Sequence, residues 1–137
     1  MLTMQALTRG EITVLGGDQT RPNIHIDDIT DLYLFLLKRP DVIGVYNAGF
    51  ENLSIRRIAE MACEKAEAKI TVLPSNDPRS YRVNSEKLLA TGFTPKKTVE
   101  NAIDEICAAY RSGQLKDQQR FHTLAWIQKT VFNQVAA

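Results

Sequence analysis

Arginines follow two of the predicted strands in this chain of 137 residues, and guanidinium groups are well suited to binding phosphate. Arg21 stands in a polar loop that follows a predicted strand at 11–15. Arg79 and Arg82 stand in an irregular segment that follows a predicted strand at 69–73. If these two strands lie side by side, both loops open at the same edge of a sheet, where their guanidinium groups could converge on one ligand. The sequence therefore favours an anion site for a phosphate or a diphosphate.

Other side chains near these arginines leave a second interpretation open. Tyr81 lies between Arg79 and Arg82 and could stack on a base or a sugar. Asp77 and Glu86 are equally close, and a single surface arginine most often pairs with a nearby carboxylate. The arginines are thus expected either to bind an anionic ligand or to pair locally with these acids.

Residues for catalysis or for metal binding are few. The two histidines, His25 and His122, are far apart in the sequence, and the cysteines form no metal-binding cluster. The glycines form no dinucleotide-binding turn, and no phosphate-loop lysine or nucleophile elbow is present. His25 is expected to be buried and hydrogen-bonded in a strand, and Asp27 or Asp28 to cap the following helix. We predict binding rather than bond breaking, with no catalytic residue and no metal site.

The composition is that of a globular domain without a dominant charge. Apolar residues make up 44% of the chain, and 17 basic residues face 16 acidic ones. No overall field attracts nucleic acid, so a nucleic-acid binder that uses Arg79, Arg82 and Lys87 is disfavoured. Cys63 and Cys107 are expected to be reduced core residues. The longest apolar run, 32–37, is too short to cross a bilayer, and we expect a cytoplasmic protein with no membrane partner.

The elements that position the arginines follow from periodicity and capping residues. Strands are predicted at 11–15, 23–26, 44–48 and 69–73. Helices are predicted at 1–9, 28–39, 55–66, 85–90 and 99–113, with a possible last helix at 121–135. The alternation predicts an α/β fold with a small mixed sheet and several packed helices.

The predicted elements divide into a main domain and an extension. A domain at 1–113 is expected to hold the binding site. The remaining residues, 114–137, are expected to form a helical extension, since Trp126 and two phenylalanines favour packing on the domain or on a partner.

Several motifs, taken in order, resemble the extended short-chain dehydrogenase/reductase family, the NAD-dependent nucleotide-sugar epimerases and dehydratases. Residues 17–28 are similar to the family stretch G-x-Q-x-R-x-x-x-H-V-x-D. Residues 45–49 resemble its Y-N-V-G strand end, and 54–59 resemble the helix that follows. Residues 76–95 resemble its closing region G-D-x-R-x-x-x-x-D-x-S-K-x-x-x-x-L-G-F-x-P. The likeness covers about 2–111, and the order of the motifs is more specific than any one of them.

The resemblance implies a substrate-binding role. In that family this region is the smaller C-terminal domain, which holds the diphosphate of a nucleotide sugar. Arg21 matches the arginine that contacts the diphosphate, and Gln19 belongs to the same motif. Both residues are therefore expected to contact the substrate.

The second phosphate contact differs from the family pattern. Many relatives have an arginine where this chain has Pro74. Arg79 or Arg82 is expected to substitute for it, with Tyr81 as a further substrate contact.

The N-terminal domain of the family has no counterpart in this sequence. Neither its glycine-rich NAD turn nor its Tyr-x-x-x-Lys pair is present, so the resemblance implies that NAD(P) binds to the intact enzymes and not to this part alone. We expect a truncation, a fragment or an expressed piece that is inactive alone and pairs with such a Rossmann domain. The alternative is a stand-alone interaction module in which 121–135 mediates self-association or docking.

Overall fold

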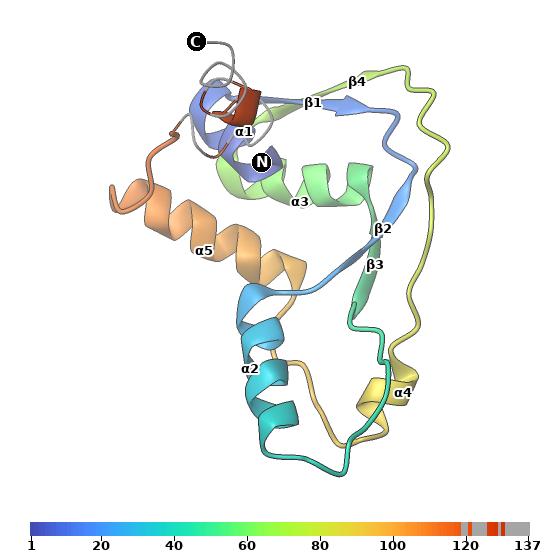
Figure 1. Ribbon diagram of the computed structural model, residues 1–137. Coiled ribbons are helices and arrows are strands. Elements are labelled where there is room, and N and C mark those ends of the chain that lie inside the picture. The colour runs from blue at the N-terminus through green and yellow to red at the C-terminus, as the bar shows by residue number, and fades with distance from the viewer. Residues whose placement is uncertain (119–120, 122–125, 129, 131–137) are drawn as a thin grey trace.

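The computed structural model describes residues 1–118, 121, 126–128 and 130 (Figure 1). The elements in chain order are α1 (Leu2–Arg9), β1 (Glu11–Leu15), β2 (Thr20–Asn23), α2 (Ile26–Leu37), β3 (Glu51–Ser54), α3 (Ile55–Ala66), β4 (Lys69–Leu73), α4 (Glu86–Leu89) and α5 (Val99–Arg111). The possible helix at 121–135, with the interaction module that depends on it, lies mostly outside the described residues.

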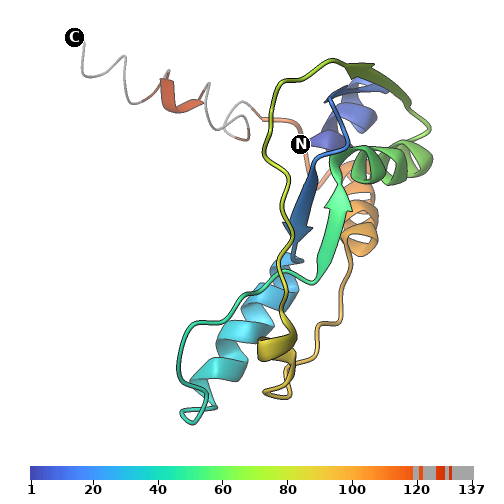
Figure 2. The same cartoon turned by 90° about the vertical axis from the view of Figure 1, so that its right-hand side faces the viewer.

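The strands form two small sheets within the described chain, which confirms the α/β class. β1 pairs in parallel with β4, and β2 pairs antiparallel with β3. The β2–β3 pair connects the end that carries β1, β4, α1 and α3 to the end that carries α2 and α4 (Figures 1 and 2). Because β1 and β4 are parallel neighbours, the loops that follow them leave the same edge, as the sequence predicted.

A first hydrophobic core lies between α1, α3, α5 and β1. Ile12 and Val14 of β1 are fully buried while the residues between and beside them are exposed, so one face of this strand meets the helices. The buried members of the first core are Ala6, Ile12, Val14, Ala59, Met61, Ala62, Cys63, Ile103 and Cys107. Both cysteines are buried and free, as predicted.

A second, smaller core lies beside α2. Its buried members are Leu32, Leu88 and Phe93. The ring of Phe93 packs edge-on against Phe35 at 5.6 Å between centroids and stacks on Phe50 at 5.8 Å. This second core holds α2, α4 and the intervening segments together.

The start of α2 differs from the prediction. The strand expected at 23–26 is wrong, because β2 ends at Asn23 and α2 begins at Ile26. His25 is the N-cap: its Nδ1 accepts the backbone N–H of Asp27 at 3.1 Å. The ring proton is therefore on Nε2, which lies 3.2 Å from Glu105 Oε2. His25 is buried and hydrogen-bonded as expected, but as a helix cap and not as a strand residue.

The expected capping role of Asp28 is also wrong, and Asp27 contributes its backbone N–H to the cap instead of its carboxylate. The carboxylate of Asp28 is buried and accepts the backbone N–H groups of Lys96 at 2.9 Å and Lys97 at 3.1 Å. Asp28 therefore ties α2 to the segment that leads into α5. No local sequence pattern indicated this contact, because its partners are 68 and 69 positions apart in the chain.

Between α2 and α3, the strand expected at 44–48 is absent, and β3 forms at 51–54, where a loop was expected. Other local signals are confirmed. Ser54 caps α3 by accepting the N–H of Arg57 at 3.1 Å, and Thr98 forms a capping box with Asn101 at the start of α5.

Candidate functional site

The loop between β1 and β2 is closed by the side chain of Gln19. Its Oε1 accepts the N–H of Gly17 at 2.7 Å, and its Nε2 donates to the carbonyl of Leu15 at 3.3 Å. Gly16 and Gly17 have φ angles of 74° and 106°, which side-chain-bearing residues rarely adopt. Gln19 thus fixes the path of the chain into β2, a structural role that the motif did not predict.

Arg21 lies in strand β2 and not in the preceding loop, which corrects the predicted position. Its side chain is only 21% exposed, and Nη1 donates to the carbonyl oxygens of Thr20 at 3.0 Å and of Arg79. Nη2 lies 3.4 Å from Asp77 Oδ2, and the guanidinium carbon lies 5.3 Å from the centre of the Tyr81 ring. The side chain is thus oriented by contacts from the segment after β4.

Asp77 is shared between two arginines. Arg79 binds it bidentately, with Nε 2.8 Å from Oδ1 and Nη2 2.8 Å from Oδ2. The hydrogen bonds from Arg79 are the largest cause that lowers the pKa of Asp77 from 3.8 to about 2, and the charge of Arg21 adds to the shift. We call Arg21, Asp77, Arg79 and Tyr81 the arginine cluster.

Backbone contacts hold the arginine cluster to β2. The N–H of Tyr81 donates to the carbonyl of Thr20 at 3.2 Å, and the N–H of Thr20 donates to Ser80 Oγ at 3.1 Å. The segment after β4 therefore meets the chain that follows β1. The condition set by the sequence, that the two strands lie side by side, is met, although Arg21 itself lies in β2. The local pairing considered as the alternative is present too, because Asp77 binds Arg79.

Arg82 lies apart from the arginine cluster. It lines a separate hollow of about 500 Å³ together with Asn52, Asn84 and Glu86. In that hollow the side-chain amide of Asn52 binds both the N–H of Val83, at 2.8 Å, and its carbonyl, at 3.0 Å. The structure therefore brings together Arg21, Arg79 and Tyr81 and leaves Arg82 facing a different surface.

Three groups that could ligate a metal lie near each other at the start of α2. Ligand atoms of His25, Asp27 and Glu105 are within 4.8 Å of one another. Lys97 Nζ lies 2.5 Å from Glu105 Oε1 and 3.8 Å from Asp27 Oδ2. The hydrogen bond from Lys97 lowers the pKa of Glu105, so a side-chain ammonium already supplies the cation that these carboxylates attract.

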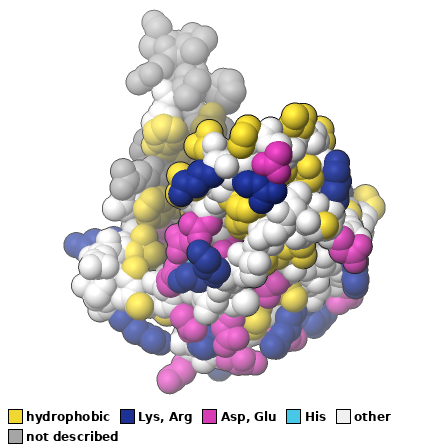
Figure 3. Space-filling model, turned by 90° about the horizontal axis from the view of Figure 1, so that it is seen from below, with side chains coloured by type: hydrophobic (Ala, Val, Ile, Leu, Met, Phe, Trp, Pro, Cys, Tyr) yellow, Lys and Arg dark blue, Asp and Glu magenta, His cyan; other side chains and the backbone are white. Residues whose placement is uncertain are grey.

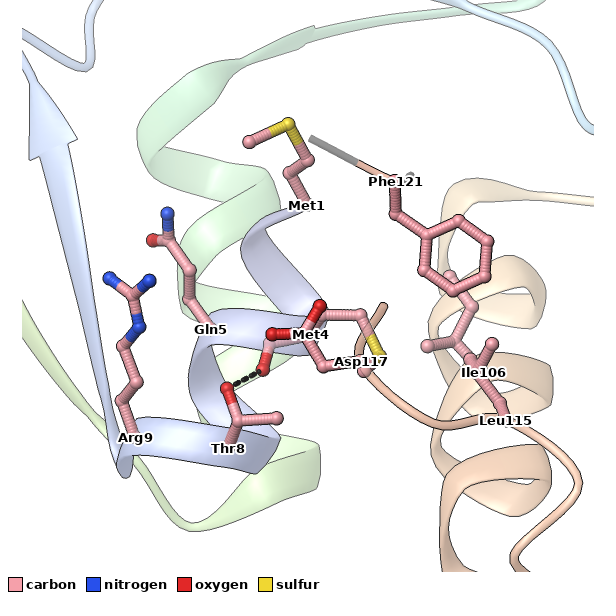
Figure 4. Close-up of a pocket in the computed structure, with 9 residues that line it drawn as sticks. All are labelled: Met1, Met4, Gln5, Thr8, Arg9, Ile106, Leu115, Asp117 and Phe121. Atoms are coloured by element: carbon pink, nitrogen blue, oxygen red, sulfur yellow. Dashed lines mark hydrogen bonds between the residues drawn. The ribbon is translucent and has the colours of Figure 1, made fainter. Parts of the chain in front are cut away.

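A hollow of about 260 Å³ lies between α1 and α5, away from the arginine cluster (Figure 4). Met4 of α1 and Ile106 of α5 contribute to its mainly apolar wall. No motif in the sequence pointed to it. Its walls come from two helices that are distant in the chain, together with residues after α5.

Charge is mixed at the end of the molecule that carries α2 and α4. Lysine, arginine, aspartate and glutamate side chains are interspersed there, with hydrophobic patches between them (Figure 3). This face carries no continuous basic surface of the kind that binds a nucleic-acid backbone. Among the described residues, no helix has the length and apolar character needed to cross a membrane.

Known proteins resemble both the sequence and the fold. GDP-L-fucose synthase 1 of Arabidopsis thaliana is 31% identical over 102 residues, which are 69% of this chain and 31% of that protein. UDP-glucose 4-epimerase of Thermotoga maritima, solved with UDP-glucose, has a TM-score of 0.68 at 18% identity over 83% of this chain and 39% of its own. RMD of Pseudomonas aeruginosa, solved with NADPH, has a TM-score of 0.63 at 23% identity over 81% of this chain and 39% of its own.

The chain is similar in sequence and fold to members of the short-chain dehydrogenase/reductase family. This confirms the resemblance that the ordered motifs indicated, and the similarity covers most of the chain. No protein-family model matches the sequence. The chain spans about a third of the length of the curated dehydrogenase/reductase relatives that it matches, 31% of one and 35% of the other.

Proposed function

We propose that this chain is the substrate-binding part of a nucleotide-sugar epimerase, dehydratase or reductase, and that Arg21 binds the diphosphate of the substrate. The observation that carries the proposal is the convergence of Arg21, from strand β2, with Arg79 and Tyr81, from the segment after β4, onto one site. Motif order and relatives whose names include nucleotide sugars support the same role. In this proposal residues 1–113 hold the site, and 114–137 pack on it or on a partner.

The arginine cluster has donor capacity left for an anion. The contact between Arg21 and Asp77 is long for a charge-assisted hydrogen bond, at 3.4 Å against a usual length of about 2.8 Å. The side chain of Arg79 is 76% exposed, so it can turn toward a ligand at little cost in buried contacts. A diphosphate offers more negative charge and more acceptor oxygens than one carboxylate. It therefore competes with Asp77 for both guanidinium groups.

Each of the other predicted contacts has a distinct part in this proposal. Tyr81 is 54% exposed and offers a ring face for a base or a sugar. Arg79 replaces the arginine that is missing at Pro74, since Arg82 lines another hollow. Gln19 acts indirectly, by fixing the loop that leads to Arg21.

NAD(P) and the catalytic acid/base would come from the part of the relatives that this chain does not span. The chain alone is then expected to bind a nucleoside diphosphate without turning over a sugar. Its role is to hold the diphosphate so that the sugar meets the cofactor.

Calorimetric titration of the chain with GDP and UDP tests the proposal. We expect weak but measurable binding, and Arg21→Ala should weaken it at least tenfold. Arg57→Ala is the matched control, because Arg57 is an exposed arginine of α3 that pairs only with Glu60 in the described chain. Asp77→Asn should tighten binding severalfold by removing the competing carboxylate. Absence of binding at millimolar ligand, or equal loss in both arginine variants, would contradict the proposal.

A further inference from the structure

The hollow between α1 and α5 is small and mainly apolar. Its apolar side chains are Met1, Met4, Ile106, Leu115 and Phe121. The hydroxyl of Thr8, at its edge, already donates to the carbonyl of Met4 at 2.6 Å (Figure 4). The volume of about 260 Å³ lies below the range of about 300–1,000 Å³ that is usual for pockets that take small-molecule ligands. The hollow therefore suits a short row of apolar side chains better than a cofactor or a nucleotide.

Helix α1 has apolar side chains on two faces, and only one of them meets a core. Thr3 and Ala6 are buried on the side of the first core. Met4 lies on the side of the hollow, and Met1, at the start of the helix, is 73% exposed. The apolar face of α1 toward the hollow is thus available for a further contact.

The chain that leaves α5 turns back toward this hollow. The N–H of Leu115 donates to the carbonyl of Ala109 at 2.9 Å, which directs the segment after α5 back along that helix. Leu115, Asp117 and Phe121 all line the hollow. Phe121 lies on the side of Ile106, across from α1 (Figure 4). The residues that follow Phe121 therefore start at the hollow itself.

The sequence after Phe121 has an apolar face at helical spacing. Leu124, Ile127 and Val131 recur at intervals of three and four positions, whereas Trp126 falls on the opposite side. The described residues have the same phase, because Ile127 is partly buried and Trp126 is 41% exposed. An amphipathic helix in a soluble domain normally packs such a face against another apolar surface.

We propose that residues 122–135 dock in cis, with Leu124, Ile127 and Val131 covering the hollow between α1 and α5. Leu124 is three positions after Phe121, and a chain spans at most about 3.6 Å per residue, so this segment begins within reach of the hollow and of few other surfaces. The tether also gives it an effective concentration on the order of millimolar, which favours it over a second copy of the chain.

This docking narrows one part of the proposed function, the packing of 114–137 on the domain or on a partner, to one surface of the same chain. It does not depend on the arginine cluster, which lies away from the hollow. Its expected consequence is structural: the docked segment braces α1 against α5 on the outer side of the first core.

The methyl groups of the methionines test the proposal in the full chain. Met1 and Met4 line the hollow, whereas Met61, the third methionine, is buried in the first core and serves as an internal reference. With isotope-labelled methyl groups, we expect nuclear Overhauser contacts between Met4 and the methyl groups of Leu124, Ile127 or Val131. We expect no such contacts from Met61.

Two adjacent variants show which side of the segment makes the contact. Ile127→Lys places a charge on the apolar face, and we expect it to abolish these contacts and to move the Met4 signal to the position of an exposed methionine. Trp126→Lys introduces the same charge one position away, at an exposed side chain, and should leave the contacts intact. An unchanged Met61 signal in both variants shows that the first core is still folded.

Three results would overturn the proposal. One is a Met4 signal at the position of an exposed methionine in the unmodified chain. Another is an equal effect of the two lysine variants on Met4. The last is a dimeric mass in light scattering with contacts that weaken on dilution, which would assign the hollow to a second copy. Titration of the same samples with GDP reports separately on the arginine cluster, so the two proposals fail independently.

Discussion

The two hydrophobic cores of this chain differ in how far its own residues enclose them. The first core is surrounded by α1, α3 and α5 around β1, and its central residues are fully buried. The second core has three buried residues and lies beside α2, a helix that also exposes Ile26, Tyr33 and Leu37. The chain itself therefore encloses the first core, whereas the second lies beside a helix that leaves apolar side chains exposed.

The sequences of the helices that cover the two cores explain why the cores differ in enclosure. The exposed side of α3 carries charged residues such as Arg57 and Glu64, so the polar face of this amphipathic helix is turned toward solvent. Helix α2 packs Ile29, Leu32 and Leu36 on the second core. It also exposes Ile26, Tyr33 and Leu37. A helix that is apolar on both sides is normally covered on both sides.

The largest effect should come from a cavity in the first core. Ile12→Ala removes a fully buried side chain of β1 and should lower the free energy of unfolding by about 3 kcal/mol. Leu88→Ala, in the second core, should cost less, about 2 kcal/mol, because the thin second core can collapse around the cavity. Urea denaturation of both variants measures the difference. A larger loss in Leu88→Ala would break the distinction between the cores.

The next largest effect should come from the contact that ties α2 to the segment before α5. Asp28→Ala leaves the backbone N–H groups of Lys96 and Lys97 without their acceptor and should cost about 2 kcal/mol. Amide exchange at these two residues should accelerate. Asp28→Asn is the control, because its amide oxygen can keep one of the two hydrogen bonds. Equal losses of stability in the two variants would show that the hydrogen bonds to Lys96 and Lys97 do not stabilise the fold.

A smaller effect should follow from the cap of α5, which belongs to the first core. Thr98→Ala removes the hydroxyl that accepts the N–H of Asn101 and should cost about 1 kcal/mol. Thr98→Ser keeps the hydroxyl and should retain most of the stability. Thermal unfolding followed by circular dichroism compares them, and indistinguishable midpoints for alanine and serine would exclude a capping contribution.

The smallest effect concerns the pH dependence of the arginine cluster. The pKa of Asp77 is about 2 in the folded chain and 3.8 without its partners, so the folded state holds this proton less tightly. Its contribution to stability is then complete above about pH 4 and is lost as the pH falls through about 2. Because Arg79 is exposed, the effect should be small and should shrink with added salt.

Denaturant midpoints between pH 4 and pH 2 measure this effect, and Asp77→Asn should flatten their slope at low salt. Asp41→Asn serves as the comparison, because Asp41 also pairs with one arginine at an exposed position. If Asp77→Asn leaves the slope unchanged, the two arginines do not stabilise the carboxylate in solution.

Local sequence determined the elements whose signals lie within a few residues. Gly10 ends α1 in a left-handed conformation, and Ser54 and Thr98 cap the helices that follow them. Strands β1 and β4 lie at their predicted residues, and their pairing brings the segment that carries Arg79 close to Arg21 of β2. The ordered motifs also indicated the family, since each depends only on the residues within it.

Tertiary structure alone decided which distant groups meet. It gave Asp77 to Arg21 and Arg79, turned Arg82 to another hollow, and buried Asp28 under Lys96 and Lys97. Among the described residues it also left 43–48 without a strand partner, although their alternation is that of a strand. The physical reason is the same in each case: a strand needs a neighbouring edge and a charge needs a partner, and neither is encoded in the spacing of residues along one segment.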